Sequence, residues 1–472
     1  MKRNKRIIHL LVAMCFIFLT LMVYLTYFEI FTSGKIETNS YNRRQWLKED
    51  STKRGNIYDR NGVILAESKK TETGWERVYP YGELYSHIIG YNSEIYGRTL
   101  IEEKFNSYLL NINEFKSVVS LDDSLLKGEK SGNNLYLTID NKLQKLASDL
   151  MGEKKGAVVV MDPKTGGILA MVSKPGFNPN STELANSWKE LADSGDSPFL
   201  PRATQGLYAP GSTFKVVMAA AALENGLGNI TFNDKGTVRI DGKEFSNSSK
   251  KAYGTVDLQK ALTVSSNVAF SQIGVRLGSK AIKDLASKIG MGQSIPFDIP
   301  VNKSVFPYNG MEKTDMAAVG IGQGKILVTP LHMAMIASCI ANKGIMIKPV
   351  MVTRAVDTEG KELKVWGTEK LYNAITADAA EKVKNMMVNV VKEGTGKNAA
   401  ISGVTVAGKT GTAENELTSK GENKEHAWFI GFAPAENPQV AVAVIVEYSG
   451  SSGGTIAAPI AGKLMEACLK RE

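Results

Sequence analysis

The chain contains few of the side chains on which many enzymes build an active site. Among its 472 residues there are only four histidines and three cysteines. No two histidines have the HExxH spacing of a zinc hydrolase, and only His426 lies near a candidate motif, so neither a zinc site nor a Ser-His-Asp triad is supported. Three cysteines make no disulfide framework, although a bridge between Cys339 and Cys468 stays open. We therefore expect an active site without a metal or another cofactor.

Excess positive charge is also small once the N-terminus is set aside. The net charge is +9, and five basic residues with one glutamate in residues 1–35 account for +4 of it. The remaining +5 is spread over more than four hundred residues. A nucleic-acid surface gains its affinity from many phosphate contacts made by Lys and Arg. We therefore expect no nucleic-acid partner.

An apolar run long enough to cross a membrane occurs once. Four basic residues in 2–6 precede a run from about residue 7 to 28, which as a helix spans roughly 33 Å, against about 30 Å for a hydrocarbon core. A cleaved signal peptide is the alternative, but its apolar region would have about 7 to 15 residues and end at small residues. Here Phe28-Glu29-Ile30-Phe31 follows instead. The basic flank predicts a cytoplasmic N-terminus, so we expect a single-pass protein of the cell membrane with an extracytoplasmic catalytic domain.

The rest of the chain is interpreted as a small accessory domain, 31–135, and a larger catalytic domain, 136–472, after a flank and anchor in 1–30. In the accessory domain, Arg54 to Ala66 with its Asp-Arg-Asn-Gly turn suggests two strands joined by a tight turn. In the larger domain, strands are expected at 157–161, 168–172, 404–409, 427–432 and 440–446, and helices at 258–270, 281–289, 330–341 and 457–469. The simplest architecture is α+β, an antiparallel sheet with a mostly helical region, about 212–400, inserted between its strands.

Three short motifs follow one another in the larger domain: Ser212-Thr213-Phe214-Lys215, Ser265-Ser266-Asn267 and Lys409-Thr410-Gly411-Thr412. The patterns also occur elsewhere, SxxK at Ser124 and Ser248, SxN at Ser40 and KTG at Lys164. Only Ser212 follows a Pro-Gly break and precedes a long apolar helical run. The copy at Lys164 lies in a turn-rich segment between two apolar runs and is interpreted as a hairpin loop. Order, spacing and context therefore favour one site.

The first motif predicts a serine nucleophile with a lysine base. Ser212 and Lys215 are three residues apart, so on a helix they share a face with Cβ atoms about 5 to 6 Å apart. Free lysine titrates near 10.4, and a base at neutral pH needs a pKa lower by about 3 units, which burial can supply. A second cation, Lys409, would lower the pKa further, and Ser265 could relay protons among these groups. These four residues are the candidate catalytic residues.

The remaining motif residues predict the binding of an anionic, acylated peptide. The backbone N–H groups of Ser212 and Thr412 are candidates for an oxyanion hole. The hydroxyls of Thr410 and Thr412, with Gly411 between them and the motif lysine beside them, form a shelf suited to a carboxylate. The amide of Asn267 can bind a substrate amide through its donor and its acceptor.

At these residues the chain resembles the penicillin-binding proteins and the serine beta-lactamases, which carry the SxxK, SxN and KTG signature. Further segments resemble class B penicillin-binding proteins: Arg54 to Gly62, His87 to Tyr91, Leu137 to Asp140, Arg202-Ala203 and Gly320 to Gly324. The resemblance spans nearly the whole chain after the anchor. The chain departs from the family at Pro201, where asparagine is common, and in the accessory region, which is short for class B.

This resemblance implies a beta-lactamase/transpeptidase-like fold and a membrane-anchored peptidoglycan D,D-transpeptidase without its own glycan polymerase. By similarity, Ser212 takes the acyl group of a donor stem peptide ending in D-Ala-D-Ala, and D-Ala leaves. An amine of a neighbouring stem, on a lipid-linked or nascent strand, then closes the cross-link. Beta-lactams would acylate the same serine. The family also implies, as membrane partner, a polytopic glycan polymerase of the shape, elongation, division and sporulation group.

Other functions stay open at this point. A D,D-carboxypeptidase, in which water replaces the acceptor amine, is the closest alternative, and the sequence does not separate it. A beta-lactamase would share the acyl-serine but usually lacks an anchor and an accessory domain. A beta-lactam sensor would carry several spans and a protease motif, and a non-catalytic wall-binding scaffold would tolerate the loss of Ser212.

Overall fold

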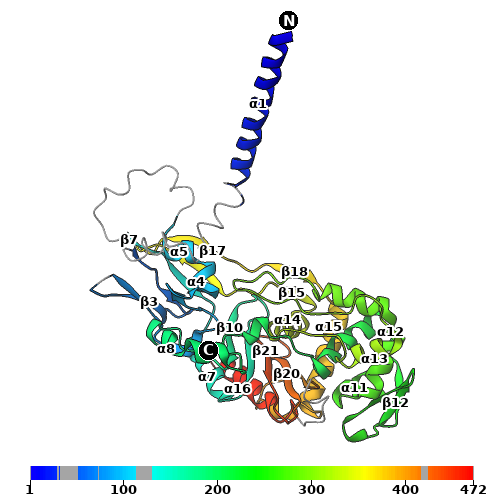
Figure 1. The fold of residues 1–472 in the computed structure, drawn as a ribbon. Helices are drawn as coiled ribbons and strands as arrows, with labels where there is room; N and C mark the ends of the chain where they lie inside the picture. Colours follow the sequence, from blue (N-terminus) through cyan, green and yellow to red (C-terminus); the bar gives the residue numbers. More distant parts are fainter. Residues whose placement is uncertain are drawn as a thin grey trace.

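The computed structural model of the chain describes residues 2–28, 31, 52–72, 74–112, 130–415 and 424–470. The motif copies at Ser40 and Ser124 lie outside these residues. The first helix, α1 (Lys2–Phe28), stands apart from the rest of the chain (Figure 1). Among the described residues it is the one helix long and apolar enough to cross a membrane, over Lys5–Phe28, which agrees with the predicted anchor.

A six-stranded sheet contains the strands of the predicted accessory region. Its order is β17-β16-β8-β2-β3-β4 (Glu362–Val365, Val352–Val356, Asn134–Leu137, Ile57–Tyr58, Ile64–Lys70 and Trp75–Val78). The predicted hairpin is confirmed, because Ile57 pairs with Ala66 and Asp59 Oδ1 accepts the backbone N–H of Asn61 at 2.7 Å within the turn. Strands β16 and β17 come from much later in the chain, so this sheet is shared between the two predicted domains.

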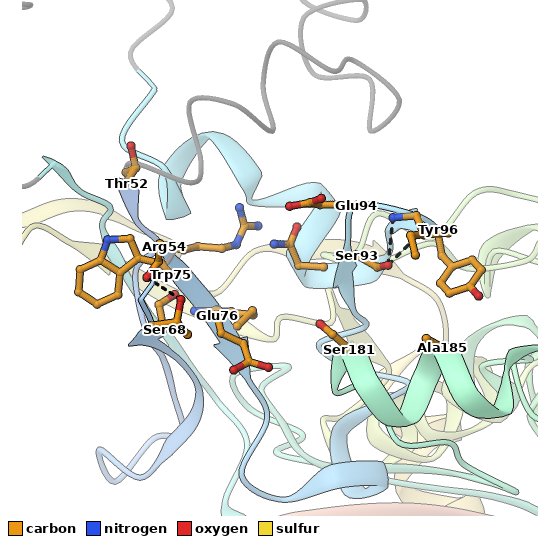
Figure 2. Close-up of a pocket in the computed structure, with 15 residues that line it drawn as sticks. Thr52, Arg54, Ser68, Trp75, Glu76, Ser93, Glu94, Tyr96, Ser181 and Ala185 are labelled. Carbon is orange, nitrogen blue, oxygen red and sulfur yellow. Dashed lines mark hydrogen bonds between the residues drawn. The ribbon is translucent and has the colours of Figure 1, made fainter.

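A buried ionic cluster lies beside this sheet. Glu102, in α4 (Leu100–Lys104), accepts hydrogen bonds from Arg54 Nε and Arg77 Nε, each at 2.7 Å. Both arginines also line a cavity of about 520 Å³, which Figure 2 shows between the strands of this region and helix α8 (Ser181–Asp193). No residue of the three motifs lines this cavity, so the cluster and the motifs are separate regions of the molecule.

The second sheet has five antiparallel strands in the order β10-β9-β21-β20-β19. Their bounds are Ile168–Lys174, Gly156–Met161, Val440–Val446, His426–Ala433 and Ala407–Ala413. The copy of KTG at Lys164 lies in the loop between β9 and β10, where Asp162 Oδ1 accepts the N–H of Lys164, so its interpretation as a turn is confirmed. The strand expected at 404–409 starts later, and it carries the whole motif from Lys409 to Thr412 on the edge of the sheet.

Both faces of this sheet are buried, which explains why β9, β10, β20 and β21 are almost continuous apolar runs. Residues of β9 alternate between two cores: Val158 and Val160 pack with α7 (Asn141–Met151) and α16 (Ala457–Leu469), and their neighbours pack on the side of α14 (Pro330–Ala341). Helices α14 and α16 match the predicted segments. The α+β fold with an antiparallel sheet is therefore confirmed.

The inserted region differs from the prediction in two ways. The helix expected at 258–270 is two helices, α11 (Leu258–Thr263) and α12 (Asn267–Lys288), because Ser265 between them has a left-handed backbone with φ of 59°. The segment expected as a separate helix, 281–289, follows a break in α12, where Gly278 has a non-helical backbone with φ of 73°, so its separation from the preceding helix is confirmed. Short hairpins also interrupt this region, formed by β11 (Thr231–Asp234), β12 (Thr237–Ile240), β13 (Lys243–Ser246), β14 (Gly254–Asp257), β15 (Ile345–Ile347) and β18 (Lys370–Asn373).

The remaining elements complete the chain. They are β1 (Thr52–Lys53), β5 (Asn92–Ser93), β6 (Gly97–Arg98), β7 (Lys130–Ser131), α5 (Asn106–Leu109), α9 (Arg202–Gln205), α10 (Lys215–Glu224), α13 (Lys313–Gly320), α15 (Ala377–Lys392), and the 3₁₀ turns η2 (Gly82–Tyr85), η4 (Gly211–Phe214), η5 (Ser248–Lys250) and η6 (Lys397–Ala399). The third copy of SxxK, at Ser248, starts the exposed turn η5, in agreement with its interpretation as a loop. Cys339 in α14 is a free thiol, so the bridge to Cys468 is not formed.

Candidate active site

Ser212 lies in the 3₁₀ turn η4, directly before helix α10, whereas the sequence predicts a regular helix start. The turn is held by Gly211, whose N–H donates to Gly322 O at 2.9 Å and whose φ is 54°. A Cβ atom on Gly322 would lie 2.0 Å from Gly211 O, so no larger residue fits there. The glycine-rich segment at 320–324 therefore packs directly behind the serine.

Lys215 is fully buried at the start of α10, and its terminal nitrogen is held by the second motif. Its Nζ donates to Ser265 O at 2.8 Å, to Ser265 Oγ at 3.2 Å and to Asn267 Oδ1 at 2.7 Å. It also lies 5.6 Å from the ring centre of Phe270. Within the part of the chain that the structure describes, Ser212 Oγ makes no hydrogen bond, so the serine hydroxyl is not engaged by another protein group.

Lys409 reaches the same serine from the edge strand β19. Its Nζ donates to Ser265 Oγ at 3.0 Å and to Thr410 O at 2.8 Å, and its side chain is fully buried. Ser265 Oγ thus lies between the amines of Lys215 and Lys409. The predicted convergence of the three motifs is what the structure contains, although they are separated by up to 197 positions between Ser212 and Lys409.

Burial favours the neutral form of both lysines. It lowers the pKa of Lys215 well below that of ordinary lysine, and the charge of Lys409 lowers it further, whereas Asp234 opposes the change. Burial alone lowers the pKa of Lys409 to about 7. Neither lysine forms an ion pair with a carboxylate among the described residues. An amine in this setting can give up its proton near neutral pH.

The last motif packs its backbone against the turn that carries the nucleophile. A Cβ on Gly411 would lie 3.0 Å from Thr213 Cγ2, and one on Gly211 would lie 2.8 Å from Thr412 O. Thr412 is exposed beside this contact. The hydroxyl of Thr410, by contrast, is 2.5 Å from Thr395 Oγ1. Part of the predicted carboxylate shelf is therefore occupied by a residue that the sequence did not indicate.

Asn267 makes hydrogen bonds to other protein groups, through its side chain and its backbone, that the sequence did not predict. Its Oδ1 accepts from Lys215 Nζ, and its Nδ2 donates to Ser246 O at 2.8 Å. Its backbone N–H donates to Asn247 Oδ1 at 2.8 Å. The contribution of the 231–257 segment to the site was not predicted, because no local pattern indicates which distant loop covers a helix N-terminus.

Histidines and metal-binding clusters do not contribute to this site. Within the described ranges no three His, Cys, Asp or Glu side chains are grouped so that they could hold a metal ion. His426 lies in β20 opposite Ala413, and its Nδ1 accepts the backbone N–H of Tyr448 at 3.1 Å. The chemistry available at the site is that of a hydroxyl beside two buried amines.

This geometry, a serine turn beside two buried lysine amines, is the arrangement found in acyl-transferring serine enzymes of the class that carries the SxxK, SxN and KTG signature. Comparison with known proteins identifies the family. Residues 156–466 match the penicillin binding protein transpeptidase domain, and residues 54–135 match the penicillin binding protein A dimerisation domain. The chain belongs to the penicillin-binding protein family.

Relatives of known function and structure resemble almost the whole chain. It is 35% identical to the peptidoglycan D,D-transpeptidase PbpA of Mycobacterium tuberculosis over 96% of each chain, and 29% identical to the peptidoglycan D,D-transpeptidase MrdA of Escherichia coli over 83% of this chain and 70% of that one. The ceftriaxone acyl-enzyme complex of M. tuberculosis penicillin-binding protein A has a TM-score of 0.84 and 34% identity, and covers 90% of this chain and 100% of that one.

Proposed function

We propose that this chain is a membrane-anchored peptidoglycan D,D-transpeptidase and that Ser212 is its nucleophile. One observation carries the assignment of roles: a single hydroxyl, Ser265 Oγ, lies 3.2 Å from Lys215 Nζ and 3.0 Å from Lys409 Nζ, beside the serine turn. The relatives named above, transpeptidases and beta-lactam acyl-enzymes, support the same chemistry.

Lys215 acts as the base that activates the nucleophile. When neutral, its amine has two N–H groups and a lone pair. The N–H groups donate to Ser265 O and Asn267 Oδ1, at 2.8 and 2.7 Å, so the lone pair is left to take the proton of Ser212 Oγ. Oγ then attacks the carbonyl carbon of the penultimate D-Ala. The backbone N–H groups of Ser212 and Thr412 stabilise the oxyanion.

Collapse of this intermediate breaks the bond between the carbonyl carbon and the nitrogen of the terminal D-Ala. The proton held by Lys215 passes through Ser265 Oγ to the leaving nitrogen, and the free D-Ala departs. An ester on Ser212 remains. In the second half, an acceptor amine attacks this ester, its proton returns through the same groups to Ser212 Oγ, and the new amide is the cross-link. Beta-lactams follow the first half only, because the opened ring stays attached and blocks the acceptor.

Substrate recognition uses the edge strand and the second motif. The hydroxyls of Thr410 and Thr412 bind the terminal carboxylate of the donor, and Lys409 adds its charge when it is protonated, at pH values near or below its pKa of about 7. Gly411 leaves room for the extended peptide beside the strand. Asn267 retains one N–H for a substrate carbonyl, because only one of its two donors is used by Ser246 O.

The wider organisation is also a proposal. The anchor in residues 1–30 holds the accessory domain, 31–135, and the transpeptidase domain, 136–472, on the extracytoplasmic side, where the cell wall is built. The basic residues before α1 favour this orientation. A polytopic glycan polymerase is the expected membrane partner. Co-purification in mild detergent that recovers no such protein would count against this partnership.

The assignment is tested with the full-length chain in detergent. After incubation with a labelled penicillin, peptide mapping should place the label on Ser212, and Ser212→Ala should take up none. Donor and acceptor stems should then yield cross-linked dimers. Trimmed monomers in the presence of acceptor would identify a D,D-carboxypeptidase, rapid penicillin turnover would identify a beta-lactamase, and a folded but unlabelled protein would refute the proposed nucleophile.

A further inference from the structure

We propose that Asp234 and Asn247 are positioning residues of the acyl-transfer site, which hold Ser265 and Asn267 against Lys215. This proposal rests on the proposed function and adds two residues, from the 231–257 segment, to the three motifs. It is carried by a continuous set of hydrogen bonds that runs from a buried carboxylate to the amine of the base.

The first step is the carboxylate of Asp234, which is buried at the end of strand β11. It accepts from Asn247 Nδ2 at 2.8 and 2.9 Å, from Ser266 Oγ at 2.5 Å and from the N–H of Gly236 at 2.8 Å. Among the described residues none of its hydrogen-bond partners is cationic. Burying a carboxylate without a cationic partner raises the free energy of the folded state unless its hydrogen bonds all form.

The second step is the start of helix α12, where the first N–H groups have no partner within the helix. Asn247 Oδ1 accepts the N–H of Asn267 at 2.8 Å and that of Val268 at 3.2 Å. Ser266 Oγ accepts the N–H of Ala269 at 2.9 Å. The two side chains that Asp234 binds thus bind three successive N–H groups of α12.

The third step is the site itself. Ser265 has a φ of 59°, a backbone conformation that costs a non-glycine residue about 1 kcal/mol or more unless its surroundings hold it. The residue after it is fixed by Asp234, and Asn267 is fixed by Asn247 and by Ser246 O. Both oxygens that receive the N–H groups of a neutral Lys215, Ser265 O and Asn267 Oδ1, are therefore set by this network.

Charge gives the network a second effect. The charged groups that face Lys215 are Lys409 from β19, which lowers the pKa of Lys215, and Asp234 from β11, which raises it. Tyr253 also faces Asp234, and burial and then this carboxylate raise the pKa of its hydroxyl, so it is neutral where the enzyme works. Removal of the Asp234 charge should lower the pKa of Lys215 and move the rise of the acylation rate to lower pH.

The experiment measures the second-order rate constant for acylation of the full-length protein by a fluorescent penicillin between pH 5 and 9. For Asp234→Asn we expect a plateau about tenfold lower or more, the order of effect for a lost hydrogen bond to a charged group, and a rise at lower pH than in the wild type. Asp234→Asn/Asn247→Asp, which returns a carboxylate to the network, should recover part of the plateau and move the rise back. Asp241→Asn, the same change at an exposed position of the same segment, should match the wild type.

Asn247→Ser keeps the Asp234 charge and withdraws the acceptor from Asn267, so the plateau should fall without a shift in pH. This variant carries the test if Asp234→Asn does not fold. A folded Asp234→Asn protein with the wild-type plateau and pH profile would overturn the proposal, as would an equal loss in the swapped double variant. If instead the wild-type protein is not acylated at Ser212, the proposed function fails first, so the two failures are distinguishable.

Discussion

Two regions of this molecule each bury a pair of basic side chains. Burial leaves one pair charged and favours the neutral form of the other. In the N-terminal region, Arg54 and Arg77 flank Glu102, which is completely buried. At the active site, Lys215 and Lys409 are equally buried but share only the hydroxyl of Ser265. Among the described residues, a carboxylate contacts the arginine pair and none contacts the lysine pair.

The chemistry of the side chains follows this difference. Burial by itself would raise the pKa of Glu102, but Arg54 and Arg77 reverse this and lower the pKa below its usual value. That cluster therefore stays ionised and contributes to structure, since arginine does not lose its proton. Within the part of the chain that the structure describes, the lysines have no such anion in contact, and their pKa values fall. The same burial produces a structural ion cluster in one place and a base in the other.

The largest expected effect comes from replacing the active-site lysine with arginine, the cation of the N-terminal cluster. Lys215→Arg places a permanent positive charge at this position and cannot act as a base, so acylation by penicillin should fall by about 10³-fold or more. Stopped-flow or gel-based labelling of the full-length protein measures the rate. Lys280→Arg, on a side chain that is 92% exposed, is the matched control. A Lys215→Arg protein that reacts within tenfold of the wild type would exclude Lys215 as the base.

The reverse change removes the anion from the structural cluster. Glu102→Gln removes the carboxylate that both buried guanidinium groups contact, and the free energy of unfolding should fall by about 3–5 kcal/mol. The acylation rate at a temperature where the variant is folded should not change. Urea unfolding followed by circular dichroism measures the stability, with the exposed Glu94→Gln as control. An equal loss of acylation rate in the folded variant would show that the two regions are coupled.

A smaller effect concerns the pH dependence of stability. Lys409 has an ordinary pKa of 10.5 when unfolded and about 7 when folded, so between these values the unfolded chain binds more protons and stability rises with pH. Lys409→Met should remove this contribution, making the rise shallower by up to about 1.4 kcal/mol per pH unit. Thermal unfolding from pH 7 to 10 is the measurement. A slope identical to that of the wild type would mean that Lys409 keeps its proton when folded.

The smallest expected effect is at the edge of the site. Thr395→Val removes the hydrogen bond between Thr395 Oγ1 and Thr410 Oγ1, which should cost about 1 kcal/mol of stability and change acylation by only a few-fold. Parallel unfolding and labelling measurements separate the two. A loss of acylation as large as that of Lys215→Arg would place Thr395 in the catalytic machinery itself.

The comparison also explains what the sequence could predict. The apolar runs of β9, β20 and β21 gave the central sheet, since strands that are buried on both faces need such residues. The motif order gave the convergence at Ser265, because each motif combines a reactive side chain with its local turn or strand. Local patterns sufficed wherever neighbours in sequence are neighbours in space.

Features made by distant segments were missed. The break at Ser265 was missed although Ser266 and Asn267 are typical of a helix start, because the apolar spacing of 258–270 was given more weight than this cap. Asp234 and Asn247, from the separate 231–257 segment, bind the residues that follow Ser265. Likewise, nothing near Thr395 indicates its contact with Thr410, and nothing in β16 indicates that it pairs with β8. At these positions, contacts with distant segments determine the conformation, and the local sequence does not indicate it.

The central claim is that burial keeps Lys215 neutral so that it can deprotonate Ser212. The pH profile of the acylation rate, measured with labelled penicillin on the full-length wild-type protein, tests it most directly. We predict a single rise whose midpoint lies well below the ordinary lysine value of 10.5 and which is absent in Ser212→Ala. A rate that rises only near that ordinary value, with the label on Ser212, would contradict the claim.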